Sequence, residues 1–408
     1  MTMRAPFGVL RVRNFRLFFA GQVASNVGTW FQSLAQALLV IELTGSAKAL
    51  GLVTALQFLP VLLLGPYGGT LADRIPPRAL LVITSGMSGL LALGLSAVTA
   101  FGKIDVFWIY AVALALGYVQ VLDRPAGQAF QYELVGPEDL PQAVGLHSTT
   151  MSSARLLGPA LAGAAYSLIG SAACFAINGV SFLCVIFALL AMRAAELHPR
   201  IRDAKPARGQ VVEGVRYAWQ HPDLRALLAV NALIGCLAFN FMTTITAMVR
   251  FEFHADANAL GAAHALNAAG AVLGSLAIAA LQRPLTRSAL ALLCATLGFT
   301  ILVNALTPGL WWFLLWAPFF GFSVGAYQTA VTTAVQRAAE PGMLGRVSSL
   351  LVLGSVGTTP IGSLIVGWLI DAWSARAAMG LGALACGLGA VMLAAAQPIR
   401  RTARGACR

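Results

Sequence analysis

The chain has 408 residues, of which 58% are hydrophobic and only 10% are charged, and its formal net charge is +12. An ordinary soluble domain is about a quarter charged, so a soluble protein of this composition could not cover its surface with polar groups. The composition therefore excludes the soluble classes and indicates an integral membrane protein. The basic residues lie in short clusters between apolar runs, a pattern that argues against nucleic-acid binding.

Roughly twelve segments are long and apolar enough to cross a bilayer, which takes about 20 residues of helix. The expected spans are residues 15–42, 47–72, 78–101, 106–122, 142–168, 171–192, 224–249, 258–281, 288–306, 310–334, 347–370 and 376–396. In lipid each segment must satisfy its own backbone polar groups, and these runs lack the alternation of barrel strands. The sequence thus predicts an all-α membrane protein of about twelve transmembrane helices.

The longest polar interval follows the sixth span and divides the chain into two halves. We predict an N-terminal six-helix half (1–192), a cytoplasmic linker (193–223), a C-terminal six-helix half (224–396) and a basic cytoplasmic tail (397–408). Apolar residues at helical spacing between Val211 and Trp219 predict a short amphipathic helix on the cytoplasmic surface. A merely flexible linker is the alternative.

The halves also repeat each other, which indicates two pseudo-symmetric six-helix bundles. One constant shift in numbering carries Arg16 onto Arg225, Arg74 onto Arg283 and Arg78 onto Arg287. The same shift places Asp73 on Gln282, so the second copy keeps the arginine pair and loses the acid. Most of the 27 Lys and Arg residues fall on one side of the spans, which predicts that both termini are cytoplasmic.

The turn after the second span places one acid and two arginines between two apolar runs, in the stretch Gly69-Thr-Leu-Ala-Asp73-Arg74-Ile-Pro-Pro-Arg78. With twelve spans, two repeated halves and a basic central loop, this turn resembles the signature of the major facilitator superfamily. The resemblance covers essentially the whole chain and implies the two-bundle fold of that superfamily. The turn departs from the usual pattern at Pro76 and Pro77, where glycine and a basic residue are common.

Further motifs resemble one particular branch of this superfamily. Asp123-Arg-Pro125, Ala154-Arg155-Leu-Leu-Gly158-Pro159 and Cys174-Phe-Ala-Ile-Asn178 are similar to the bacterial exporter branch that contains the enterobactin exporter. The spacing Gly158-Pro159-x-x-x-Gly163 also resembles the antiporter motif of drug exporters. Both resemblances imply efflux, usually against proton entry.

The superfamily resemblance assigns a gating latch to the turn between the second and third spans. Its members here are Gly69, Asp73, Arg74, Arg78 and Asp123. Asp73 is expected to face the start of the eleventh helix, whose N–H groups stabilise a carboxylate. Arg74 and Arg78 are expected to pair with Asp123 at the cytoplasmic end of the fourth helix, which would lock the outward-facing state and break when the cytoplasmic side opens. The alternative is that these charges only fix the topology.

The fifth span carries the motif Arg155, Gly158, Pro159 and Gly163. Proline lacks an N–H and collides with the preceding turn, which predicts a kink at Gly158-Pro159, and the glycines permit close helix packing. A charge near mid-helix costs about 2.5–3.5 kcal/mol on insertion scales, so Arg155 is expected to face a cavity or a partner. We expect it to contact substrate or take part in coupling. The alternatives are snorkelling or a structural hydrogen bond.

Polar side chains within the spans predict the lining of a substrate cavity. The first helix has a polar stripe at steps of three and four residues. The candidates are Gln22, Asn26, Trp30, Gln57, Tyr118, Arg155, Asn231, Asn240 and His264. Gln57, Tyr118 and His264 are the weaker candidates, since each alone is more often an interhelical hydrogen bond than a ligand contact. The acids Glu42, Asp73, Asp123 and Asp371 are expected at helix ends, which leaves Glu42, His147 and His264 as weak candidates for proton coupling.

The sequence predicts a secondary transporter, not an enzyme, since its loops lack paired carboxylates, metal-ligand spacing and a nucleophile with its base. We expect export of an amphipathic small molecule (a siderophore, drug or secondary metabolite) by alternating access, with protons as the exchange partner that the resemblance implies. No metal or cofactor is expected. The expected setting is the bacterial plasma (inner) membrane, with lipids around a monomer. The alternatives are a lipid or lysolipid translocator of the same fold, and a non-transporting receptor or scaffold.

Overall fold

A computed structural model describes residues 8–72, 74–198, 210–281, 285–340 and 342–395. The first half contains η1 (Gly8–Arg11), α1 (Arg13–Thr44), α2 (Ala47–Ala72), α3 (Pro77–Ala100), α4 (Val106–Leu190) and η2 (Ala194–Glu196). It is followed by α5 (Gln210–Gln220), α6 (Pro222–Leu237), α7 (Phe241–Ala247), the π-helical η3 (Met248–Glu252), α8 (Ala257–Ala280), α9 (Arg287–Ala305), α10 (Leu310–Ala338), α11 (Leu344–Val352), the π-helical η4 (Leu353–Gly357), α12 (Thr359–Ala372) and α13 (Ala375–Ala395). The predicted all-α class is confirmed.

Ten helical segments in the described part of the chain are long and apolar enough to cross a membrane. One of them, Gln142–Leu190, has 49 residues and contains Gly170 at φ 75°, which glycine adopts without strain and which divides the segment into two passes. With α1, which has 32 residues, the count agrees with the expected twelve spans. The expected fourth span was too short, because helix α4 continues past residue 122 as far as Gly136, at φ 70°.

Local sequence sets several helix ends. Gly45 adopts the left-handed conformation and ends α1, and Pro77 stands in the first turn of α3. The side chain of Asp256 accepts a hydrogen bond from the Ala259 amide at 2.9 Å and caps α8. Thr286 caps α9 in the same way through the Ala289 amide.

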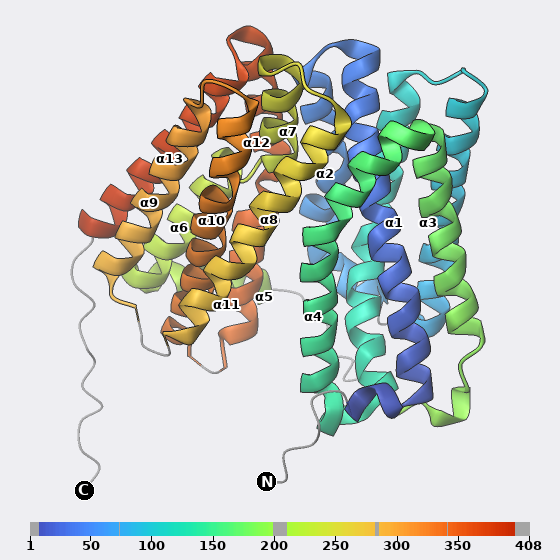
Figure 1. The fold of residues 1–408 in the computed structure, drawn as a ribbon. Coiled ribbons are helices and arrows are strands. Elements are labelled where there is room, and N and C mark those ends of the chain that lie inside the picture. Colours follow the sequence, from blue (N-terminus) through green and yellow to red (C-terminus); the bar gives the residue numbers. More distant parts are fainter. Residues whose placement is uncertain (1–7, 73, 199–209, 282–284, 341, 396–408) are drawn as a thin grey trace, which may run out of the picture.

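Figure 1 shows two helical bundles side by side, close together at one end and apart at the other. We call the end with the α1–α2 and α12–α13 junctions the upper end, and the end where α1 begins and α13 finishes the lower end. Across the halves, α2 packs on α12 and α4 packs on α8. At Gly51 and Gly163 any side chain would overlap the backbone of the facing helix, so glycine permits these close approaches.

The predicted linker helix is present as α5, and it is bonded to the second half. The guanidinium of Arg346 lies 2.9 Å from the Glu213 carboxylate, and the Tyr217 hydroxyl accepts a hydrogen bond from the Glu340 amide at 3.2 Å. The position of α5 on the cytoplasmic surface and the division into domains stay predictions.

Candidate functional site

Three helices meet between the two halves at a contact built from small residues. The indole of Trp30 on α1 lies over Gly158 on α4, where even a methyl group would overlap the ring. Gly261 on α8 faces the carbonyl of Pro159, and a Cβ placed on this glycine would lie 2.5 Å from that oxygen. Residues Gly158 to Gly163 therefore hold α1 and α8 against one face of α4. Helical dihedrals continue through Pro159, so the expected kink stays a prediction.

Arg155 lies about one helical turn below this contact, toward the lower end. At 3.6 residues per turn its direction falls between that of Gly158, which faces α1, and that of Gly163, which faces α8. The lipid-exposed side of the same helix, marked by Leu157 and Leu161, points the opposite way. Arg155 is exposed, whereas Ala162, about two turns higher on the same face, is fully buried. Helical geometry thus directs the Arg155 side chain toward the side of α4 that faces α1 and α8.

Two further predicted residues reach the same level from the neighbouring helices. Asn26 lies about one turn below Trp30 on α1, and His264 lies about one turn below Gly261 on α8. The Nδ2 of Asn26 and the Nε2 of His264 are buried, and neither has a hydrogen-bond partner in the described part of the chain. A buried polar atom without a partner is rare and costly. We call Asn26, Arg155 and His264 the central polar site.

The remaining predicted cavity residues divide into two groups. Gln22 and Gln57 are half-buried and Tyr118 is exposed. Asn231 and Asn240 are buried, and their amide groups donate to the backbone carbonyls of Leu351 at 3.0 Å and Cys236 at 2.6 Å. These two asparagines therefore serve helix contacts in this structure, and a contact with substrate stays a prediction for all five.

The predicted latch is only partly described. Gly69 lies in the last turns of α2, and Asp73 and its repeat partner Gln282 lie outside the described residues. Arg78 donates to the carbonyls of Leu189 at 2.9 Å, Leu190 at 3.3 Å and Met192 at 3.2 Å. It thereby binds carbonyls at and just after the end of α4 that the helix itself leaves without a donor.

In the described part of the chain no ion pair joins Arg74 or Arg78 to Asp123, so their expected pairing stays a prediction for the outward-facing state. Asp123 accepts a hydrogen bond from the Thr84 hydroxyl on α3 at 2.6 Å. The predicted place of Asp123 at a helix end is wrong, because α4 continues for about three and a half more turns to Gly136. The apolar run ended near residue 122, but the backbone helix did not.

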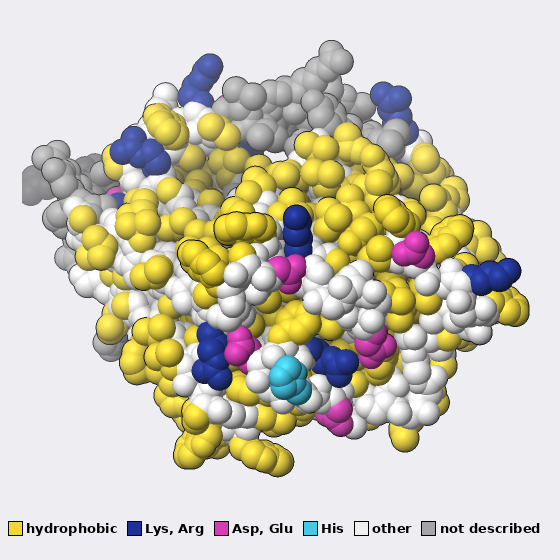
Figure 2. Space-filling view, turned by 90° about the horizontal axis from the view of Figure 1, so that it is seen from above, with side chains coloured by type: hydrophobic (Ala, Val, Ile, Leu, Met, Phe, Trp, Pro, Cys, Tyr) yellow, Lys and Arg dark blue, Asp and Glu magenta, His cyan; other side chains and the backbone are white. Residues whose placement is uncertain are grey.

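Sequence reasoning missed a polar contact between the halves at the upper end. The carboxylate of Asp371, at the end of α12, accepts hydrogen bonds from the Ser46 hydroxyl at 2.5 Å, the Ala47 amide at 2.7 Å and the Lys48 amide at 3.1 Å. It thus caps the N-terminus of α2 from the opposite half, where the helix dipole favours an anion. Figure 2 shows acidic and basic side chains next to one another on this face.

A second contact between the halves lies at the same end. Tyr166 of α4 donates to the Glu42 carboxylate at 2.7 Å, and the Arg250 guanidinium from η3 lies 3.7 Å from the same carboxylate. Since Glu42 is 42% exposed, this ion pair is worth little alone. The ion pair nevertheless marks a contact between the halves, because it joins the end of α1 to the π-helical segment η3 of the other half.

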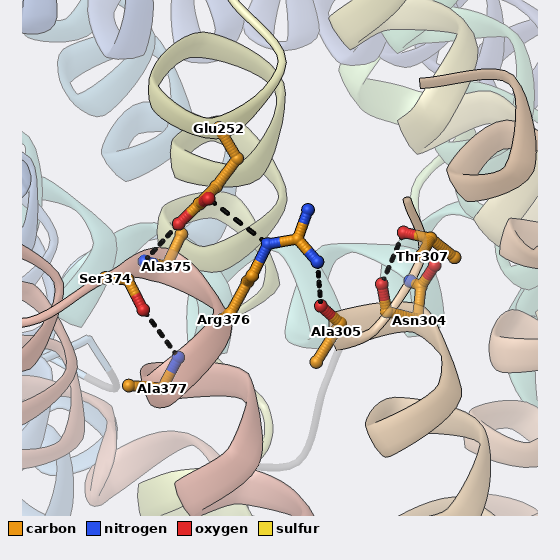
Figure 3. Close-up of polar contacts among 8 residues, drawn as sticks. All are labelled: Glu252, Asn304, Ala305, Thr307, Ser374, Ala375, Arg376 and Ala377. Atoms are coloured by element: carbon orange, nitrogen blue, oxygen red, sulfur yellow. Dashed lines mark hydrogen bonds and ion pairs between the residues drawn. The ribbon is translucent and has the colours of Figure 1, made fainter. Parts of the chain in front are cut away.

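Arg376 holds the upper end of the second half together (Figure 3). Its guanidinium lies 3.2 Å from the Glu252 carboxylate and donates to the Ala305 carbonyl at 3.1 Å. Glu252 also accepts the Ala375 amide at 3.1 Å. These bonds join the ends of η3 and α9 to the start of α13. In the sequence, Asp371, Glu42 and Arg376 are visible only as charged residues at helix ends. That position does not reveal which residue each one binds.

This chain is similar in sequence to a family of membrane proteins and to known transporters. A family model described as transmembrane secretion effector matches residues 4–404. The multidrug efflux pump Tap of Mycolicibacterium fortuitum is 24% identical over 92% of this chain and 95% of its own. The staphyloferrin A transporter of Staphylococcus aureus is 24% identical over 64% of this chain and 66% of its own.

Solved structures share the fold. A bacterial homologue of the iron transporter ferroportin, in an inward-facing state, has a TM-score of 0.72 at 16% identity and covers 94% of this chain and 98% of its own. A bacterial homologue of the lysosomal transporter Spinster, also inward-facing, has a TM-score of 0.72 at 14% identity, with 94% of each chain covered. The chain belongs to the transmembrane secretion effector family, within the major facilitator superfamily.

Proposed function

We propose that this protein exports an amphipathic small molecule by alternating access, with the central polar site as part of its binding surface. The observation that carries the proposal is that Asn26, Arg155 and His264 lie on one level of three packed helices, about one turn below the contact of Gly158 with Trp30 and of Pro159 with Gly261. Efflux pumps and a siderophore transporter among similar proteins support an export function.

The charge distribution supports an orientation. If the Lys- and Arg-rich side of the spans is cytoplasmic, the lower end faces the cytoplasm and the upper end faces outward. The bundles are then closed on the outside and separated toward the cytoplasm, as a state that loads substrate from inside requires. The proposed location is the bacterial inner membrane, with a monomer in contact with lipids.

Each end of the molecule has its own role in the proposed cycle. Substrate enters from the cytoplasm or the inner leaflet and reaches the central polar site. Release requires the halves to part at the upper end, so the bonds of Asp371 to α2 and of Glu42 to Arg250 must break. The turn from Gly69 to Arg78 is proposed to close the lower end in that second state.

Uptake into inverted membrane vesicles tests the export function. A panel of labelled compounds, including a macrolide and a metal-free carboxylate siderophore, is assayed with and without a pH gradient. We expect accumulation of at least one compound above vesicles that lack the protein. Dependence on the gradient tests the proton exchange that the superfamily resemblance implies.

Two arginine variants separate the site from general charge effects. Arg155→Gln removes the cation of the central polar site and is expected to lower uptake at least about tenfold, the usual scale for a lost hydrogen bond to a charged group. Arg193→Gln is the matched control, since that side chain is 66% exposed and pairs with Glu196 in the loop after α4. Equal uptake by wild type and Arg155→Gln would contradict the site assignment.

A further inference from the structure

The central polar site presents hydrogen-bond donors and one uncompensated cation. Arg155 is the sole Asp, Glu, Lys or Arg residue within Gln142–Leu190. In the described part of the chain no carboxylate forms an ion pair with it. The side chain of Arg155 is exposed in this structure, so the guanidinium is accessible to a ligand. The site therefore offers a cation to which the described residues supply no counter-ion.

The neighbouring groups fit the same kind of ligand. The Nδ2 of Asn26 can act only as a donor, and it is buried without an acceptor. The Nε2 of His264 is likewise buried without a partner, on a side chain that is 8% exposed, and it can donate in one tautomer. Their positions about one turn below Trp30 and Gly261 place both at the level of Arg155.

We infer that the exported substrate carries an anionic oxygen group, a carboxylate or its equivalent, which Arg155 binds with help from Asn26 and His264. A planar guanidinium suits carboxylate geometry and binds it through paired hydrogen bonds. The indole of Trp30, about one turn higher, lies beside the site and suits the apolar part of an amphipathic molecule. The inference rests on the export proposal and narrows its substrate class.

Binding of a matched pair of probes to the purified full-length protein tests the inference. N-dansyl-leucine carries a carboxylate, and N-dansyl-leucinamide has the same scaffold without the charge. Fluorescence anisotropy is expected to show at least about tenfold tighter binding of the carboxylate, as for hydrogen bonds to charged groups. Arg155→Gln should remove this preference, Arg155→Lys should keep part of it, and Arg193→Gln should leave it unchanged.

Asn26→Ala distinguishes a binding role from a structural one. Because its Nδ2 has no partner in the described residues, its removal should leave the melting temperature unchanged or raise it while weakening carboxylate binding. A fall in melting temperature with unchanged binding would assign Asn26 to packing and contradict its part in the site.

Equal affinity of the two probes, including failure of both to bind, would overturn the inference, and so would a preference retained by Arg155→Gln. Export of neutral compounds with no preference for the carboxylate would refute it while leaving the export function intact. Absence of export for every compound counts against the export function, whereas a carboxylate preference in binding would still support the anion site.

Discussion

Asp371 of α12 accepts a hydrogen bond from the backbone amide of Ala47, the first residue of α2, at 2.7 Å and across the two halves. An acid from one bundle thus caps a helix of the other. The cap exists only while the upper end is closed, so its free energy contributes to the difference between the two states of the cycle rather than to the fold of either half. This position makes Asp371 a residue that sets the conformational balance.

Asp371→Ala should shift the protein toward the state that is open at the upper end. Loss of an N-cap acid corresponds to roughly a fivefold change in an equilibrium. Spin labels at Lys103→Cys and Pro308→Cys, both exposed at upper-end loops of different halves, report the separation. For Asp371→Ala we expect the distribution of distances between the two labels to shift to longer values than in wild type.

Asp256→Ala is the matched control for this measurement. Asp256 also caps a helix at the upper end, but the helix is its own α8, so the cap does not cross between the halves. The variant should lower stability by about 0.5–2 kcal/mol and leave the label distances unchanged. If both variants lengthen the distances alike, Asp371 has no special role between the states.

Glu42→Gln should shift the same distances in the same direction, by less than Asp371→Ala. The ion pair with Arg250 at 3.7 Å is partly exposed and therefore weak. In wild type, a higher salt concentration should lengthen the upper-end label distances as Glu42→Gln does, because salt screens the ion pair. In the Glu42→Gln variant, added salt should change these distances little. Insensitivity of the wild-type distances to salt and to Glu42→Gln would show that the pair does not hold the upper end.

Gly261→Val should weaken the contact between α8 and α4. A Cβ at this position would meet the Pro159 carbonyl at 2.5 Å and the Cα of Gly163 at 3.2 Å, both on the backbone of a packed helix. We expect a lower melting temperature and an altered upper-end distance. Gly94→Val is the control, because nothing lies within 4 Å of a Cβ there; equal effects of the two variants would argue against a tight α4–α8 contact.

Arg78→Gln should destabilise the first half without changing the upper-end distances. The side chain donates to three carbonyls near the end of α4, and a glutamine cannot span them. A lower melting temperature in detergent is expected, with Arg193→Gln as the exposed arginine control. An unchanged melting temperature would show that these bonds add nothing to stability.

The fold follows from sequence because spanning length and loop charge are properties of single segments. The length and hydropathy of one apolar segment predict a spanning helix, whatever that helix packs against. Helix ends are less predictable: hydropathy marked the end of the apolar run near residue 122, while the helix continued to Gly136 through polar residues. Asp123 was misplaced for that reason.

Single polar residues in a span were predictable as a class, but their roles were not. Asn26, Arg155 and His264 share one level only because three separate helices are held at Trp30, Gly158 and Gly261. Asn231, of the same residue type as Asn26, donates instead to a backbone carbonyl. The partner of Asp371 lies more than 300 residues away in sequence, and no local pattern encodes it.

The central claim is that the two ends of this protein open in turn around one site. Two label pairs measured in parallel test it: Lys103→Cys with Pro308→Cys at the upper end, and Ala195→Cys with Ala338→Cys at the lower end, all exposed positions. On introduction of Asp371→Ala, we predict longer upper-end and shorter lower-end distances. Distances that stay fixed at both ends, or that lengthen together, would contradict alternating access in this chain.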